Sequence, residues 1–369
     1  MKVATISLDD YANYGNNLQK YALQKTIKKF ADFTELLWDS GTDFFPETTE
    51  WLYTSNPFPV NCDPINRQKY IYREVVHLNK MKEFENRYIK VRFDLPYLEE
   101  IADDYDFFIV GSDQVWGPKF IKPKLFLNFA PRKKRIAYAA SIATPKIPDQ
   151  LKEFYKWGIS GFDHIAVREE NAVKIIKELT GQDALLVVDP IMLLTKAEWL
   201  EIAQKPSWVK EQYPRGYILT YYIRTTPPPI IKSIAQKLNL PVINLLDWNN
   251  YWHYAVGPEE FLYLFANASL IFTNSFHGVV FSILFRKPFV NIEVDLNMTM
   301  SMRIPGLLKM FNLEDRTLIQ GKSYTAESFL DIDYRTRDKI LPLERGKAFK
   351  FLSSALGVKP CQKLRGGGR

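Results

Sequence analysis

A histidine stands at the start of a predicted helix that directly follows an apolar strand. The apolar run 276–285 reads as the helix, and Ser275 can cap it. The free N–H groups of Phe276, His277 and Gly278 then form an anion site, which Gly278 keeps open to a ligand. His277 can move a proton near neutral pH. We therefore expect a catalytic histidine here rather than a purely structural one.

An arginine follows another predicted strand, residues 165–167. The planar guanidinium of Arg168 suits carboxylate and phosphate groups, because it donates two parallel hydrogen bonds. A local salt bridge to Glu169 or Glu170 is the alternative. Glu169 fits the first turn of the next helix, where the helix dipole favours an acid. We therefore expect Arg168 to face the substrate.

Polar residues follow a third strand, the uncharged run 107–110. Asp113 can accept a hydrogen bond from a sugar hydroxyl or act as its base. Trp116 offers a ring that can lie under a sugar face. A role for Asp113 in capping the next turn is equally compatible with the sequence.

The loop after the first predicted strand, residues 3–8, is also rich in polar side chains. Gly15 allows another part of the chain to approach its backbone closely, and Asn16 can cap the helix that follows. We place Asn13, Tyr14 and Asn16 on the acceptor side of the site.

An aromatic segment, residues 247–254, follows the predicted strand 242–245. We assign Trp252 to the acceptor, because a ring at a strand end can stack on a sugar or rest against a lipid headgroup layer. The favoured alternative is that Trp248 and Trp252 share a buried helical face, since tryptophan is usually buried. The long loop 39–63 is a competing acceptor wall.

These side chains need a fold that brings strand ends together. Strand-like runs alternate with helical patterns, which predicts α/β domains with mostly parallel sheets and helices on both faces. Ligands of such sheets bind beyond the carboxyl ends of the strands. The 369 residues fit two domains. We expect an N-terminal acceptor domain at 1–195, a C-terminal donor domain at 196–342, a terminal helix at 343–358 and a flexible tail at 359–369.

The composition limits which classes of ligand the protein is expected to bind. The formal net charge of +7 favours anionic ligands, but the single dense basic run 132–135 does not predict nucleic-acid binding. Cys62 and Cys361 have no metal-binding spacing, and no HExxH motif occurs, so no metal is expected. With no signal peptide and no apolar run of membrane-spanning length, the expected location is cytoplasmic.

The sequence resembles the polysaccharide pyruvyl transferase family over residues 13–288. The resemblance rests on six motifs in order: Asn13-Tyr14-Gly15-Asn16 with Leu18-Gln19, Gly111-Ser112-Asp113-Gln114-Val115-Trp116, Ala139-Ala140-Ser141, Val167-Arg168-Glu169, Val188-Asp189-Pro190 and Ser275-Phe276-His277-Gly278. It implies a fold similar to the B-type glycosyltransferases, with two Rossmann-like domains facing a cleft and a terminal helix that crosses back.

The same resemblance implies a reaction. The donor is phosphoenolpyruvate, the product is a pyruvate ketal on a sugar of a cell-surface polysaccharide or its precursor, and no cofactor is needed. Arg168 matches a residue that holds the donor, and His277 matches the histidine beside it. Ser275 stands where some relatives carry a basic residue, so donor contacts must come from Ser275, backbone amides or another cation. A lipid-linked acceptor would bring the protein to the inner face of the membrane.

Two other functions fit the same elements. A glycosyltransferase of this fold would hold the diphosphate of a nucleotide sugar at the same helix start. A non-catalytic relative would bind glycans or an anionic metabolite without turnover. Consumption of phosphoenolpyruvate without a nucleotide distinguishes pyruvyl transfer from both.

Overall fold

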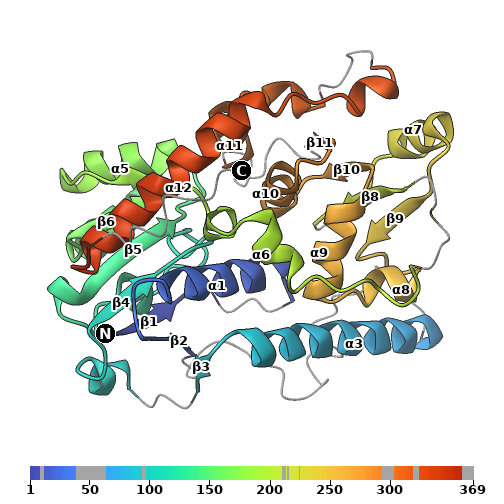
Figure 1. Cartoon of the computed structure of the whole chain (residues 1–369). Coiled ribbons are helices and arrows are strands. Elements are labelled where there is room, and N and C mark those ends of the chain that lie inside the picture. The colour runs from blue at the N-terminus through green and yellow to red at the C-terminus, as the bar shows by residue number, and fades with distance from the viewer. Residues whose placement is uncertain are drawn as a thin grey trace.

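Two parallel β-sheets form the centre of the molecule (Figure 1). The computed structural model describes residues 1–8, 12–38, 64–93, 97–209, 213, 216–223, 225–292, 303–318 and 324–359. The first sheet has seven strands in the order β3-β2-β1-β4-β5-β6-β7, and the second has four in the order β11-β10-β8-β9. The α/β class with parallel sheets is as predicted. The loop 39–63 and most of the tail lie outside the described residues.

The first sheet consists of β1 (Lys2–Ile6), β2 (Phe33–Leu37), β3 (Val91–Arg92), β4 (Phe107–Val110), β5 (Arg135–Ala140), β6 (His164–Val167) and β7 (Leu185–Leu186). The second consists of β8 (Ile218–Tyr221), β9 (Val242–Leu245), β10 (Leu270–Thr273) and β11 (Phe289–Asn291). The helices of the first half are α1 (Tyr14–Ile27), α3 (Pro64–Tyr88), α4 (Lys152–Ser160) and α5 (Glu170–Thr180). Those that follow are α6 (Lys196–Leu200), α7 (Ile230–Leu238), α8 (Tyr251–Tyr254), α9 (Pro258–Asn267), α10 (Phe276–Phe285), α11 (Arg303–Phe311) and α12 (Arg335–Ala355).

Side-chain caps set the starts of two helices where the sequence places them. The Ser275 hydroxyl accepts a hydrogen bond from the Gly278 N–H at 3.3 Å at the start of α10. Thr195 and Glu198 cap α6 reciprocally, with the Thr195 N–H donating to the Glu198 carboxylate at 2.7 Å. Such caps satisfy N–H groups that a helix leaves free, so they mark helix starts from local sequence alone.

The two halves share one hydrophobic core. Tyr14 at the start of α1 stacks on Phe261 of α9, with 4.6 Å between ring centroids, and its hydroxyl donates to the Val256 carbonyl at 2.8 Å. Helix α3 spans both halves, and its Lys80 pairs with Glu260 of α9 at 2.7 Å. The relative position of the two sheets is therefore fixed by buried contacts and by ion pairs.

Helix α12 also contacts both halves (Figure 1). It begins at Arg335, earlier than the predicted residue 343, and its Asp338 pairs with Arg286 at the end of α10. Farther along, Arg345 donates to the carbonyl oxygens of Met192 and Leu194, both at 2.6 Å. The terminal helix thus runs from the second half back onto the first. Within the described residues, no helix is both long and apolar enough to cross a bilayer.

Candidate active site

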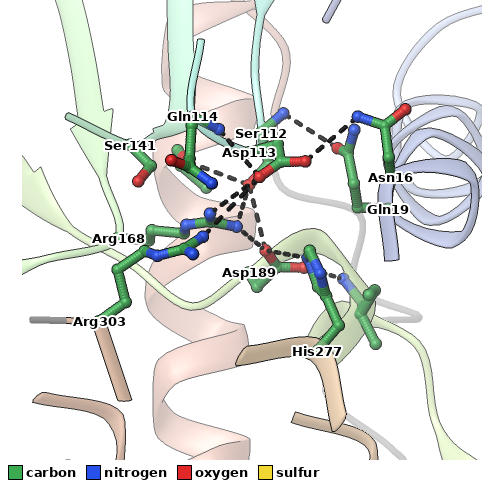
Figure 2. Close-up of polar contacts among 12 residues, drawn as sticks. Asn16, Gln19, Ser112, Asp113, Gln114, Ser141, Arg168, Asp189, His277 and Arg303 are labelled. Atoms are coloured by element: carbon green, nitrogen blue, oxygen red, sulfur yellow. Dashed lines mark hydrogen bonds and ion pairs between the residues drawn. The ribbon is translucent and has the colours of Figure 1, made fainter. Parts of the chain in front are cut away.

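Polar side chains from several strand ends meet between the two sheets (Figure 2). Asp113 follows β4, Arg168 follows β6 and Asp189 follows β7 in the first half. His277 joins them from the first turn of α10 in the second half. The carboxyl ends of parallel strands lie on one edge of a sheet, so residues far apart in sequence converge there.

Arg168 lies at the centre of this cluster. Its Nη1 donates to Asp189 Oδ2 at 2.6 Å and to the Ser112 hydroxyl at 3.3 Å, and its Nη2 lies 3.3 Å from Asp113 Oδ1. Burial alone would raise the pKa of Asp189, but the nearby His277 and the Arg168 charge hold that pKa well below its usual value. Arg168 is therefore held by carboxylates before any ligand binds, rather than by a salt bridge to its neighbours in sequence alone.

Asp113 is oriented by the first half of the chain. Its backbone has a φ of 64°, in the left-handed region that aspartate tolerates better than most residues. Oδ2 accepts a hydrogen bond from Asn16 Nδ2 at 3.2 Å, which brings the start of α1 into the site. Burial opposes ionisation of Asp113, but Arg168 and the other cations around it keep the pKa below its ordinary value. The carboxylate is thus ionised and able to accept a proton or a hydrogen bond.

His277 lies against Gly15. A Cβ atom added at Gly15 would stand 1.9 Å from His277 Nδ1, so the imidazole occupies the space that this glycine leaves free. His277 Nε2 lies 3.8 Å from Asp189 Oδ2, too far for a hydrogen bond, and has no other partner among the described residues. Arg168 and His277 therefore approach the same carboxylate oxygen from opposite halves, as the prediction of a shared site requires.

Arg303 is a second arginine of the site, which the sequence reasoning missed. It is the first residue of α11 and is 7% exposed. Its guanidinium carbon lies 5.3 Å from the ring centroid of Phe276, and that of Arg168 lies 4.5 Å from the same centroid. Burial, together with repulsion from Arg168, lowers the pKa of Arg303 to about 10, so it remains charged at neutral pH. No strand-end pattern precedes Arg303, and only tertiary packing places it here.

The cluster opens into a cavity of about 570 Å³. Its inner wall carries both arginines, Glu169, Asp189 and Phe276, and its outer wall carries Lys174 and Lys309. The remaining lining residues come from β7, the segment that follows it, and helices α5, α11 and α12: Glu170, Asn171, Leu186, Val187, Val188, Pro305, Gly306, Leu307, Met310 and Glu344.

The sequence model of the family described as polysaccharide pyruvyl transferase matches residues 13–295, a span that contains the cluster apart from Arg303. The chain belongs to this family. None of the curated proteins matches it.

Several solved structures are similar in fold to nearly the whole chain. UDP-GlcNAc 2-epimerase from Neisseria meningitidis is 9% identical over 98% of this chain and 95% of its own, with a TM-score of 0.46. Anabaena HepE, solved with UDP and glucose, is 11% identical over 96% of this chain and 100% of its own, with a TM-score of 0.48.

The donor residues expected at the start of α10 divide into two groups. Phe276 and His277 face the cluster. Ser275 is 3% exposed and caps the helix. A Cβ atom at Gly278 would stand 2.3 Å from Thr273 Oγ1, so this glycine makes room for the preceding strand as well as for a helix start.

Two residues assigned to the acceptor lie in the core instead. Trp116 has no exposed surface, stacks on Phe126 at 5.6 Å and donates its indole N–H to the Leu125 carbonyl at 2.9 Å. Tyr14 is equally buried at the junction of the two halves. Neither ring is accessible to a sugar, so the prediction that Tyr14 and Trp116 bind the acceptor is wrong. Both belong to family motifs whose role here is packing.

The other acceptor candidates have different positions. Asn13 Oδ1 accepts a hydrogen bond from the Asn16 N–H at 3.3 Å, so Asn13 caps α1 while Asn16 reaches Asp113. Trp252 is 54% exposed on the short helix α8, with its ring edge-to-face against Tyr251. The alternative that Trp248 and Trp252 share a buried helical face is therefore wrong. Figure 1 shows α8 beside β9, and Trp252 is not among the residues that line the cavity.

The described part of the chain contains no group of three or more His, Cys, Asp or Glu side chains arranged to hold a metal ion. The chemistry available to the site therefore consists of anion binding by two guanidinium groups, proton transfer by His277 and carboxylates, and orientation of hydroxyl groups by Asp113.

Proposed function

We propose that this protein transfers a pyruvyl group from phosphoenolpyruvate to a sugar of a cell-surface polysaccharide or its precursor, forming a pyruvate ketal and releasing phosphate. The observation that supports it most is the pair of buried guanidinium groups near Phe276, the residue before His277. Phosphoenolpyruvate carries a carboxylate and a phosphate on the same carbon, and two arginines at one cavity match those two anions.

The two arginines differ in what already holds them. Arg168 is paired with Asp189 and Asp113, so its orientation is fixed before the donor arrives. Arg303 has its nearest ion-pair contact at 3.9 Å, to Asp113. The buried Nε atoms of both arginines have no hydrogen-bond partner among the described residues, and a buried donor without a partner favours a ligand acceptor. Both guanidinium groups can therefore bind the donor anions, with Arg168 oriented beforehand and Arg303 the less neutralised of the two.

Proton transfer completes the chemistry. His277 is general acid to the donor or general base to the sugar hydroxyl, and Asp113 orients or deprotonates that hydroxyl. The two arginines stabilise negative charge as phosphate leaves. The donor is itself an activated enol ester, so the residues of the chain suffice to bind, orient and exchange protons.

The acceptor occupies the part of the cavity that the small donor leaves empty. That outer part is walled by α5 and α11 and carries Lys174 and Lys309, which suit a sugar bearing a phosphate, whether lipid-linked or nucleotide-linked. In this arrangement the hydroxyls of the sugar face the inner wall, where Arg168 and Asp189 lie.

Phosphate release from phosphoenolpyruvate, measured against a panel of lipid-linked and nucleotide-linked sugars, tests the proposal. We expect release that depends on the acceptor and needs no nucleotide sugar as donor. Transfer of a sugar from a nucleotide sugar, with phosphoenolpyruvate left intact, would instead identify a glycosyltransferase. Binding of phosphoenolpyruvate without release for any acceptor would identify a non-catalytic member.

A further inference from the structure

Glu169 is a buried acid beside Arg168, and the reaction proposed above assigns it no role. It precedes α5 as the N-cap residue, yet its side chain makes no capping hydrogen bond. The residue is 7% exposed and lines the same cavity as Arg168 and Arg303. An acid at a helix start normally stabilises the helix dipole. Here the carboxyl group is turned to the wall of the site instead.

The two oxygens of Glu169 have different surroundings. Oε1 accepts a hydrogen bond from the hydroxyl of Ser141, the residue that follows β5, and lies 3.7 Å from Arg168 Nε. Oε2 is buried and has no hydrogen-bond partner among the described residues. Ser141 itself is fully buried, so it holds the carboxyl group in one orientation. A proton on this group is therefore carried by Oε2, the oxygen without a hydrogen-bond partner.

The surroundings of Glu169 also favour its neutral form. Burial raises the pKa of Glu169, and the opposing effects of Arg168 and the Ser141 hydrogen bond do not reverse that shift. Asp113 and Asp189, in the same cluster, have lowered pKa values. When the pKa values of neighbouring carboxyl groups are shifted in opposite directions, one group can serve as an acid while the others stay ionised. This arrangement is common in acid–base catalysis.

We propose that Glu169 is the general acid that protonates the methylene carbon of the donor. This role rests on the proposed pyruvyl transfer. It gives His277, which lies on the α1 side of the cluster against Gly15, the separate role of base to the sugar hydroxyl. Acid and base then approach the reacting carbon from different elements.

The proton of Glu169 and the π electrons of the donor double bond form the new C–H bond of the methyl group, leaving an oxocarbenium-like central carbon. One sugar hydroxyl adds there and its proton passes to His277. The C–O bond to phosphate breaks with its electron pair on phosphate, which takes the proton from His277. A second hydroxyl closes the ketal and returns its proton to Glu169.

The test compares Glu169→Gln with Glu178→Gln in the full chain. Glu178 is the control because it is an exposed glutamate of the adjoining helix α5 and does not line the cavity. We expect Glu169→Gln to lower kcat by about 10²-fold or more while the Kd for phosphoenolpyruvate stays within about threefold. We expect Glu169→Asp to recover part of the loss, and Glu178→Gln to behave as wild type.

The pH profile separates an acid from a structural residue. With Glu169 as acid, wild-type kcat falls as pH rises through the raised pKa of this group, and the residual rate of Glu169→Gln lacks that limb. Near-normal kcat in Glu169→Gln, or an unchanged alkaline limb with weakened donor binding and a lower Tm, would overturn the role. If wild type releases no phosphate with any acceptor, the failure lies in the proposed function, and the role of Glu169 as acid falls with it.

Discussion

The charges of the two arginines in the cluster are compensated to different degrees. Arg168 pairs with two buried carboxylates, Asp189 and Asp113, so its burial is balanced within the protein. Arg303 is also buried, but its nearest carboxylate, that of Asp113, is 3.9 Å away, and burial lowers its pKa. Because a weakly compensated buried charge costs free energy, we expect Arg303 to stabilise the fold less than Arg168 does and to bind a ligand anion.

Replacing Arg303 with Gln separates binding from stability. We expect the Kd for phosphoenolpyruvate, measured by calorimetry, to rise about tenfold or more, because one charge-assisted contact to the donor is lost. The Tm is expected to stay within about 2 °C of wild type or to rise, since a buried cation is removed.

Arg168→Gln is the contrasting variant. It should also weaken donor binding, but it leaves Asp189 and Asp113 buried without their cation, so its Tm should fall by several degrees. Equal losses of Tm in the two variants would show that Arg303, too, is a structural ion-pair partner.

At the scale of elements, the site depends on two helix starts that touch. The first turn of α1 packs on the first turn of α10 through Gly15 and His277, and Asn16 of α1 reaches Asp113 at the end of β4. Short loops after strands hold both helix starts. A shift of either helix therefore moves the acid–base residues relative to the two arginines.

Gly15→Ala tests this contact between helices. The added Cβ would stand 1.9 Å from His277 Nδ1, so the imidazole or the start of α1 must move. We expect kcat/KM for phosphate release to fall about tenfold or more, since small displacements of catalytic groups are costly. Gly346→Ala in α12 is the control. Its Cβ meets nothing within 4 Å, and helix propensity predicts unchanged activity with slightly higher stability. Equal activity in both variants would contradict a positioning role for Gly15.

His77 of α3 makes the stability of the junction between the two halves depend on pH. It is 1% exposed, and its two ring nitrogens lie 3.2 Å from the carbonyl oxygens of Val256 and Ala12. Burial lowers its pKa below the unfolded value of about 6.5, so the unfolded chain binds this proton more readily. The stabilisation is complete above that pH and is lost as pH falls below it.

Denaturant unfolding between pH 8 and pH 5 measures this contribution. We expect the free energy of unfolding of wild type to decrease toward pH 5, and that of His77→Gln to be lower at pH 8 but to depend less on pH. The control is His164→Gln, at the half-buried start of β6. An identical pH dependence in wild type and His77→Gln would exclude His77 as the source.

Short sequence patterns predicted the helices and strands well, whereas the positions of individual side chains in the core or the site depend on tertiary packing. The helix start at Ser275 follows from a cap and an apolar run, both of which are visible in neighbouring residues. The prediction for Trp116 failed because a ring after a strand is compatible with a surface or a core, and only the stack on Phe126 distinguishes them. Arg303 carries no local signal at all, since its place depends on how α11 packs on α10.

At the scale of the whole molecule, the site exists only because the two halves are held together. One hydrophobic core crosses the junction, and α3 adds the ion pairs Lys80–Glu260 and Arg87–Glu259. Helix α12 contacts elements of both halves. A site assembled from two halves needs such a fixed interface, because each half supplies groups that the other lacks. The net charge of +7 adds a general attraction for anionic substrates.

The surface around α8 bears on how a large acceptor is held. Trp252 is 54% exposed and Tyr72 of α3 is 61% exposed, and Tyr72 stacks on Tyr251 with 5.8 Å between ring centroids. Amphipathic rings of this kind favour the interface between water and lipid headgroups. Because Trp252 does not line the cavity, we assign it to the carrier of the acceptor rather than to the sugar that reacts.

Trp252→Ala is therefore expected to affect only acceptors presented on a membrane. With a lipid-linked sugar in vesicles, we expect kcat/KM for the acceptor to fall about threefold to tenfold, because an exposed ring contributes about 1 kcal/mol at such an interface. The Kd for phosphoenolpyruvate and the Tm should match wild type, since the ring is not part of the core. Trp157→Ala, which removes an exposed tryptophan on α4, is the control and should leave kcat/KM unchanged for both kinds of acceptor. A short soluble acceptor should be used equally well by all three proteins. If Trp252→Ala slows the soluble acceptor as much as the lipid-linked one, the ring contacts the sugar itself. If it slows neither, the carrier binds elsewhere on the molecule.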